Sequence, residues 1–118
     1  MPRPDTAAFR HVDAPDVLAV HITGEFDVSN AGDLQAELRA AARAGKDVVL
    51  DLSGVTFMDV VSYELIMTAR GAVRAGGHTL SLTNTPRNVQ RIIDVVDREI
   101  RRHAPVPRSA RGFPGLAS

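Results

Sequence analysis

Residues 48–63 read VVLDLSGVTFMDVVSY, and they contain the clearest secondary-structure signals of the chain. Its first part, 48–52, is a short apolar run of the kind found in a central strand that is buried on both faces. A loop at 56–58 follows, and Asp59 then stands where the N-cap of a helix over 60–75 belongs. The stretch therefore predicts a buried strand, a loop and a capped helix.

Strands and a helix also precede this stretch. A hairpin is expected from a weak strand at 7–12 and a second strand at 17–23 that ends at Gly24. A helix then begins near residues 29–30, where good capping side chains stand, and stops at Gly45. The order of these elements is two strands followed by a helix.

The same alternation continues downstream. A strand is expected at 79–83, and Thr85 with Pro86 is a cap followed by proline at the first helical position. Residues 98–103 either extend this third helix or form a separate turn. The side chains predicted to face the core are Val61, Leu65, Ala69 and Ala72, flanked by Ile66 and Val73, and then Val89, Ile92, Ile93 and Val96 of the third helix. This order predicts a single α/β domain whose helices pack mainly on one face.

Composition excludes several classes of protein. The chain has 118 residues, enough for one core, with 44% hydrophobic residues and no cysteine. Disulfide frameworks and thiol chemistry are therefore excluded. Aromatic residues make up only 4%, which argues against a base-stacking nucleic-acid site. No apolar run approaches the length of a membrane span and no secretory signal is visible, so a cytoplasmic protein is expected.

The formal charge of zero hides an asymmetry. Residues 98–118 carry five arginines against one glutamate, a net charge of +4, and residues 1–97 carry −4. We expect a domain at 1–97 and a basic extension at 98–118 that contains proline and glycine and is partly disordered.

The sequence contains no recognisable catalytic motif. Gly76 and Gly77 end a helix instead of opening one, so there is no phosphate loop. The four histidines lack metal-ligand spacing. Asp27, Asp51 and Asp59 invite a carboxylate site, but helix capping accounts for Asp59 and a metal would need more oxygen ligands. No enzyme activity, metal or cofactor is expected.

Four blocks in a fixed order resemble the STAS domain family, within it the bacterial anti-sigma factor antagonists of the SpoIIAA and RsbV type. The blocks are ITGEFD (22–27) leading into Ser29-Asn30-Ala31, VVLDLSGVTFMD (48–59), GGHTLSL (76–82) and PRNVQRII (86–93), within residues 7–97. The resemblance implies a four-stranded mixed sheet with helices packed on one side. It also implies a partner, an anti-sigma factor that is a GHKL-type serine kinase. The antagonist binds this kinase, frees a sigma factor and is then switched off by phosphorylation.

The sequence departs from the family at the phosphorylated position. Members usually read Asp-Ser-Ser/Thr-Gly, and the second hydroxyl residue accepts the phosphate. This chain reads Asp59-Val60-Val61-Ser62, so Val61 occupies the acceptor position. The protein is then an antagonist without an off-switch, or Ser62 or Thr56 has become the acceptor, or the scaffold has drifted to another interaction.

The predicted partner-binding surface joins the loop after the second strand to the start of the helix at 60–75. Its members are Asp27, Ser29, Asn30, Asp59, Val60, Val61, Ser62 and Tyr63. Six of them have a structural alternative: Asp27, Ser29 and Asp59 as caps, Val60 and Val61 as core, and Ser62 as a hydroxyl bonded to backbone. Neither a direct nucleic-acid partner nor a membrane is expected, and a second copy of the chain is a further candidate partner. The rival function is a scaffold or ligand-sensing module in a signalling assembly.

Overall fold

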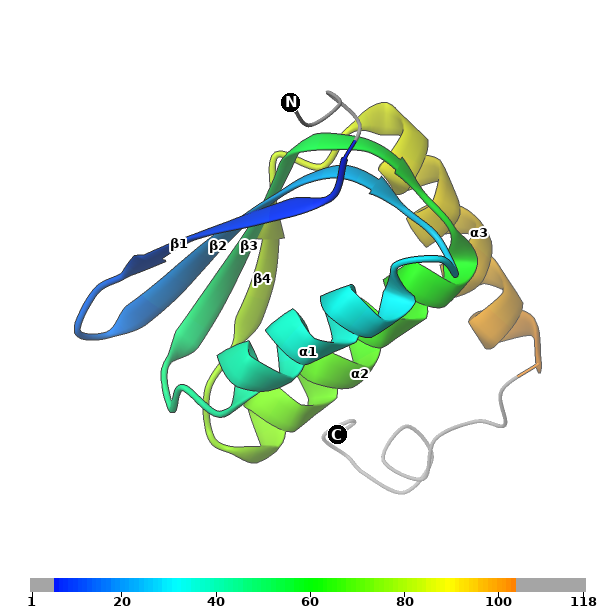
Figure 1. Ribbon diagram of the computed structural model, residues 1–118. Coiled ribbons are helices and arrows are strands. Elements are labelled where there is room, and N and C mark those ends of the chain that lie inside the picture. Colours follow the sequence, from blue (N-terminus) through cyan, green and yellow to red (C-terminus); the bar gives the residue numbers. More distant parts are fainter. Residues whose placement is uncertain (1–5, 104–118) are drawn as a thin grey trace, which may run out of the picture.

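The computed structural model describes residues 6–103, which form one sheet and three helices (Figure 1). The strands lie in the order β1-β2-β3-β4, with β1 antiparallel to β2 and the other neighbours parallel. The predicted four-stranded mixed sheet is therefore confirmed. The elements in chain order are β1 (Ala8–Asp13), β2 (Val17–Phe26), α1 (Ala31–Ala42), β3 (Asp47–Met58), α2 (Val60–Ala75), β4 (Leu80–Thr83) and α3 (Arg87–His103).

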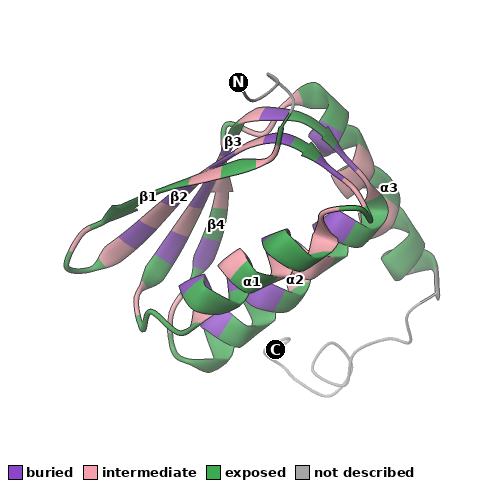
Figure 2. Cartoon of the chain, viewed as in Figure 1, coloured by how far each residue is buried: buried purple, intermediate pink, exposed green. Residues whose placement is uncertain are grey.

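Helices α1 and α2 lie side by side on one face of the sheet (Figure 1). The crossovers β2-α1-β3 and β3-α2-β4 both join parallel neighbours and advance in the same direction across the sheet. Because such crossovers are right-handed, both helices fall on the same face. Alternate residues of the strands therefore point into a core beneath them, seen as the purple bands of Figure 2. These core residues include Leu18, Val20, Ile22 and Phe26 of β2 and Val48, Leu50 and Leu52 of β3.

The opposite face of the sheet, called the open face below, is not covered by α1 or α2. Val49 and Asp51 of β3 point to it and are only half-buried. The prediction that the strand at 48–52 is buried on both faces is therefore wrong. An apolar run indicates a strand, but it does not show how many faces of that strand are covered. Strand order and crossover handedness decide which faces of the sheet the helices cover.

Both central strands are longer than the sequence predicted. β2 continues past Gly24 to Phe26, and β3 continues through the expected loop to Met58. Gly24 has a φ of 100° and stands at a register shift between the two strands, so it marks a β-bulge within β2 and not the end of the strand. A Cβ on Gly24 would lie 2.5 Å from the carbonyl oxygen of Thr6, which explains why this position needs glycine.

Helix α3 starts at Arg87, one residue after Pro86, which was the predicted first helical position, and the N–H of Gln90 donates a hydrogen bond to the Pro86 carbonyl. Val89 is buried and the rest of the predicted apolar stripe is half-buried. The helix runs without a break through Asp97, so residues 98–103 extend it. The remainder of the expected extension, 104–118, lies outside the described residues. Within residues 6–103 no helix is long and apolar enough to cross a membrane.

Candidate docking site

The two predicted site segments meet at one edge of the sheet. Because β2 and β3 are parallel, their carboxyl ends lie together, and Phe26 pairs with Met58. The backbone N–H of Asp59 donates a hydrogen bond of 3.0 Å to the carbonyl of Phe26. The loop after β2 and the first turn of α2 are therefore neighbours. We call residues 27–30 and 57–61 together the docking end.

The loop at 27–30 is held by its own side chains. The Asp27 carboxylate accepts hydrogen bonds from the Ser29 N–H (2.9 Å) and the Ser29 hydroxyl (2.5 Å), and these bonds lower the pKa of Asp27. Asn30 accepts from the Asp27 N–H at 3.0 Å and donates to the Glu25 carbonyl at 2.8 Å. The side chain of Asn30 thus braces the loop and makes no capping bond to α1. The loop is ordered before any partner arrives.

Asp59 caps α2 as the sequence predicted. Its backbone is extended, and its carboxylate accepts a hydrogen bond of 2.8 Å from the N–H of Ser62. The helix then runs over Val60–Ala75, the residues expected for it. One free N–H group of the first turn is satisfied in this way, and the negative charge lies at the positive end of the helix dipole.

The docking end exposes four large apolar side chains. Val60 and Val61 are 41% and 44% exposed, and Phe57 and Val28 are 47% and 73% exposed. The interpretation of Val60 and Val61 as core residues is therefore wrong. Apolar side chains concentrated in this way at one end of a domain are typical of a protein-interaction surface.

Ser62 and Tyr63 do not belong to this surface, because both side chains are buried. The inward residues of α2 are Ser62, Tyr63, Ile66, Ala69 and Val73, so the predicted stripe through Val61, Leu65 and Ala72 is rotated by about one residue. Of its central positions only Ala69 is buried. The Ser62 hydroxyl has no hydrogen-bond partner among the described residues, so the predicted bond from this hydroxyl to backbone is not formed. Such a hydroxyl is closed to a kinase unless the helix start moves.

Sequence reasoning missed Val28 and Phe57 as surface residues. Val28 stands between Asp27 and Ser29, in a loop where these two polar side chains hydrogen-bond to each other. Phe57 was assigned to a loop, whereas it lies in β3 beside a register shift. A valine flanked by two capping-type residues is the sequence signal that could have revealed the first of them.

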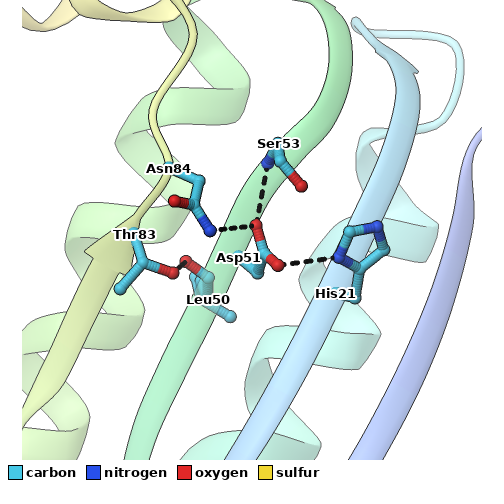
Figure 3. A network of polar contacts seen from close by, with 6 residues as sticks. All are labelled: His21, Leu50, Asp51, Ser53, Thr83 and Asn84. Atoms are coloured by element: carbon cyan, nitrogen blue, oxygen red, sulfur yellow. Dashed lines mark hydrogen bonds and ion pairs between the residues drawn. The ribbon is translucent and has the colours of Figure 1, made fainter.

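A polar network occupies the middle of the open face, away from the docking end (Figure 3). Asp51 accepts from the Ser53 N–H at 2.9 Å and the Asn84 amide at 3.2 Å, and it contacts His21 Nδ1 at 3.0 Å. These contacts, chiefly the Ser53 bond, hold the pKa of Asp51 well below its usual range. His11 lies on the other face and contacts Glu37 at 2.6 Å, so the two histidines do not face each other. Within residues 6–103 no three metal-ligating side chains come together.

The fold is shared with solved anti-sigma factor antagonists. An antagonist from Mycobacterium paratuberculosis superposes with a TM-score of 0.68 at 20% identity, covering 86% of each chain. SpoIIAA in its unphosphorylated form gives 0.63 at 15% identity, covering 85% of this chain and 100% of that one. Phosphorylated SpoIIAA of Bacillus gives 0.60 at 14% identity, covering 80% and 98%.

The sequence also matches a protein-family model. The model is described as "Mlab, STAS domain", and the match runs over residues 9–99, from β1 into α3. It therefore includes all of the sheet except the first residue of β1, both segments of the docking end and the open face. This chain belongs to the STAS domain family.

Proposed function

We propose that this protein binds an anti-sigma factor of the GHKL-type serine kinase class through its docking end, and thereby releases a sigma factor. The observation that carries the proposal is the group of exposed apolar side chains at the docking end, Val28, Phe57, Val60 and Val61. Removing exposed apolar side chains from water contributes favourable free energy when a partner covers them. The hydrogen-bonded loop beside them is already ordered, which lowers the entropic cost of association.

The proposed interaction lacks a phosphorylation switch at the family's usual acceptor position. Val61, at the usual acceptor position, carries no hydroxyl, and the Ser62 hydroxyl next to it is buried. A phosphate on Ser62 would need space and solvation that a buried position does not offer. The protein then acts as a permanent antagonist, whose activity is set by how much of it is made and by competition for the partner.

Charge around the docking end indicates the chemistry of the partner. Residues 11–38 and 47–69 contain no lysine or arginine, so the charged side chains nearest in sequence to the docking end are acidic. They are Glu25, Asp27, Asp33, Asp59 and Glu64. A partner that carries basic side chains around an apolar contact would be complementary, and its association would slow as salt concentration rises.

Binding to purified anti-sigma kinases of the source organism tests the proposal. We expect isothermal titration calorimetry to detect binding by the unaltered protein and at least a tenfold loss of affinity in Val61→Asp. Val95→Asp is the matched control, because Val95 is 49% exposed on α3 outside the docking end and should leave affinity unchanged. Failure of every kinase to bind, or equal loss in both variants, would refute this function.

The second candidate is a scaffold role in another assembly, through the same docking end. The match to a family model described as "Mlab, STAS domain", which does not name an anti-sigma factor antagonist, supports it together with valine at the acceptor position. Affinity capture with Val61→Asp as the negative control separates the two candidates. A captured partner that is not a kinase, and that is lost in Val61→Asp, would favour the scaffold role.

A further inference from the structure

A cavity lies between α2, β4 and α3, away from the docking end. Helix α2 packs against both β4 and α3, and the three elements leave a space of about 390 Å³ between them. Ligand sites in proteins have volumes of roughly 300–1,000 Å³, so this one is at the lower end of the range. None of its lining residues belongs to residues 27–30 or 57–61. The cavity is therefore a separate site, and its size suits a small molecule.

Apolar side chains form half of the lining. They are Met67 of α2, Leu80 and Leu82 of β4, and Ile93 of α3. Leu80 is buried, and the other three are half-buried. A methionine among them adapts to more than one ligand shape, because its side chain is unbranched and flexible. The walls therefore favour a ligand with an apolar body.

Tyr63 brings a phenol to the same cavity. Its side chain is only 3% exposed, and its hydroxyl forms no hydrogen bond with the residues at 6–103. A buried tyrosine usually finds a partner for its hydroxyl. Because the Tyr63 oxygen is not itself enclosed in the protein, it is accessible to a molecule in the cavity. The phenol is thus a hydrogen-bonding group that a ligand can use.

Two opposite charges face this cavity from different helices. Arg70 of α2 is exposed and Asp97 of α3 is half-buried. Burial raises the pKa of the Tyr63 phenol, Asp97 raises it further and Arg70 lowers it, so both charged groups lie near the phenol. Within the described part of the chain, neither Arg70 nor Asp97 forms an ion pair. A molecule that carries both charges would complement them.

We propose that this cavity binds a free α-amino acid with an apolar side chain. The Arg70 guanidinium donates to the carboxylate of the ligand, since its planar fork matches that group. The Asp97 carboxylate accepts hydrogen bonds from the ammonium group. The Tyr63 hydroxyl donates to the ligand carboxylate, and the ligand side chain lies against Met67 and Ile93.

The charges of the cavity disfavour other classes of small molecule. A nucleotide or another multiply charged anion would meet one cation, Arg70, and would be repelled by Asp97. A simple amine would be repelled by Arg70, and a fatty acid by Asp97. A zwitterion alone satisfies both side chains, which is why the proposal names this class.

Calorimetric titration of the full chain with L-leucine, L-methionine and L-phenylalanine is the first test. At least one of the three should bind with a dissociation constant of about 10 µM to 1 mM. The chain has one tyrosine and no tryptophan, so tyrosine fluorescence reports on Tyr63 alone and should change with the same dissociation constant. Absence of binding by all three at about 10 mM would overturn the proposal.

Charge-removing variants test the assigned contacts. Arg70→Gln and Asp97→Asn should each weaken binding by about tenfold or more, because each removes a hydrogen bond to a charged group. Arg74→Gln and Asp94→Asn are the matched controls, since they remove the same charges from the same two helices at exposed positions outside the cavity. Both controls should bind normally. Unchanged affinity in Arg70→Gln or in Asp97→Asn would contradict the proposal.

Ligand analogues test the same contacts on the unaltered protein, independently of any effect of substitution on folding. Leucinamide lacks the carboxylate of leucine, and 4-methylpentanoate lacks its ammonium group. Each analogue should bind about tenfold or more weakly than leucine. An analogue that binds as tightly as leucine would show that the corresponding charge is not recognised, and the assignment of a zwitterion would be wrong.

Discussion

The Asp59 N–H and the Phe26 carbonyl, 3.0 Å apart, join the end of β2 to the start of α2. Asp59 uses its side chain to cap the helix and its backbone to hold the neighbouring strand, so one residue fixes both segments of the docking end. The apolar side chains on either side of this bond are presented by rigid elements. A surface built in this way can bind a partner without first being ordered.

Replacing Ser62 with alanine should stabilise the protein. The buried hydroxyl has no partner among the described residues, and an unsatisfied buried polar group costs about 1–3 kcal/mol. We expect Ser62→Ala to raise the free energy of unfolding by about 1 kcal/mol in urea titrations. Ser81→Ala, at an exposed position on β4, should change it little. A loss of stability in Ser62→Ala would show that the hydroxyl has a partner.

Introducing serine at position 61 should create the missing phosphorylation site. Val61 is 44% exposed in the first turn of α2, where the helix dipole favours a phosphate. A kinase that binds this protein should transfer about one phosphate per chain to Val61→Ser and none to the unaltered protein. Mass spectrometry measures both, and Val61→Ala should remain unlabelled. Phosphate found on Ser62 of the unaltered protein would contradict the absence of a switch.

Stability should fall in acid partly because of Asp51. Its pKa is lowered in the folded state, so the folded protein favours the ionised form. The stabilisation is present above the pKa of the unfolded chain, about 3.9, and is lost as the pH falls below that value. Asp51→Asn should cost on the order of 1 kcal/mol at pH 7, since the group is partly exposed. The difference between the two proteins should shrink between pH 5 and pH 2, and a difference that does not change with pH would contradict this role.

Two glycine substitutions should have opposite effects. Gly24→Ala combines a φ of 100° with a Cβ that would approach Thr6 to 2.5 Å, so it should destabilise the fold by about 1–3 kcal/mol. Gly71 lies inside α2 with nothing within 4 Å of a new Cβ. Gly71→Ala should therefore stabilise by about 0.8 kcal/mol through helix propensity. Thermal or urea unfolding measures both, and equal effects would exclude this explanation.

Local chemistry allowed much of this fold to be predicted from sequence. Asp59 before Val60 is a capping pattern that acts within one turn, and the helix it starts has the expected bounds. Pro86 likewise fixes the start of α3 through its own backbone geometry. The family resemblance adds the sheet and the place of the docking end.

Features set by distant parts of the chain could not be predicted. The buried side of α2 includes Ser62 because of the way the helix packs against the sheet. The apolar residues of α2 fit two neighbouring sides of the helix almost equally well, so the sequence did not distinguish them. The length of β2 depends on a bulge at Gly24, which sequence alone reads as a strand end. The open face depends on strand order, which no local pattern encodes.

The parallel run of β2 and β3 also ties the docking end to positions far from it. Both strands reach the same edge of the sheet, so one inserted or deleted residue in either strand would shift Phe26 relative to Met58. The bulge at Gly24 lies two residues before Phe26, so a substitution there would displace the loop at 27–30 as well as destabilise the fold. The lengths of two strands therefore decide how the loop and the helix start meet.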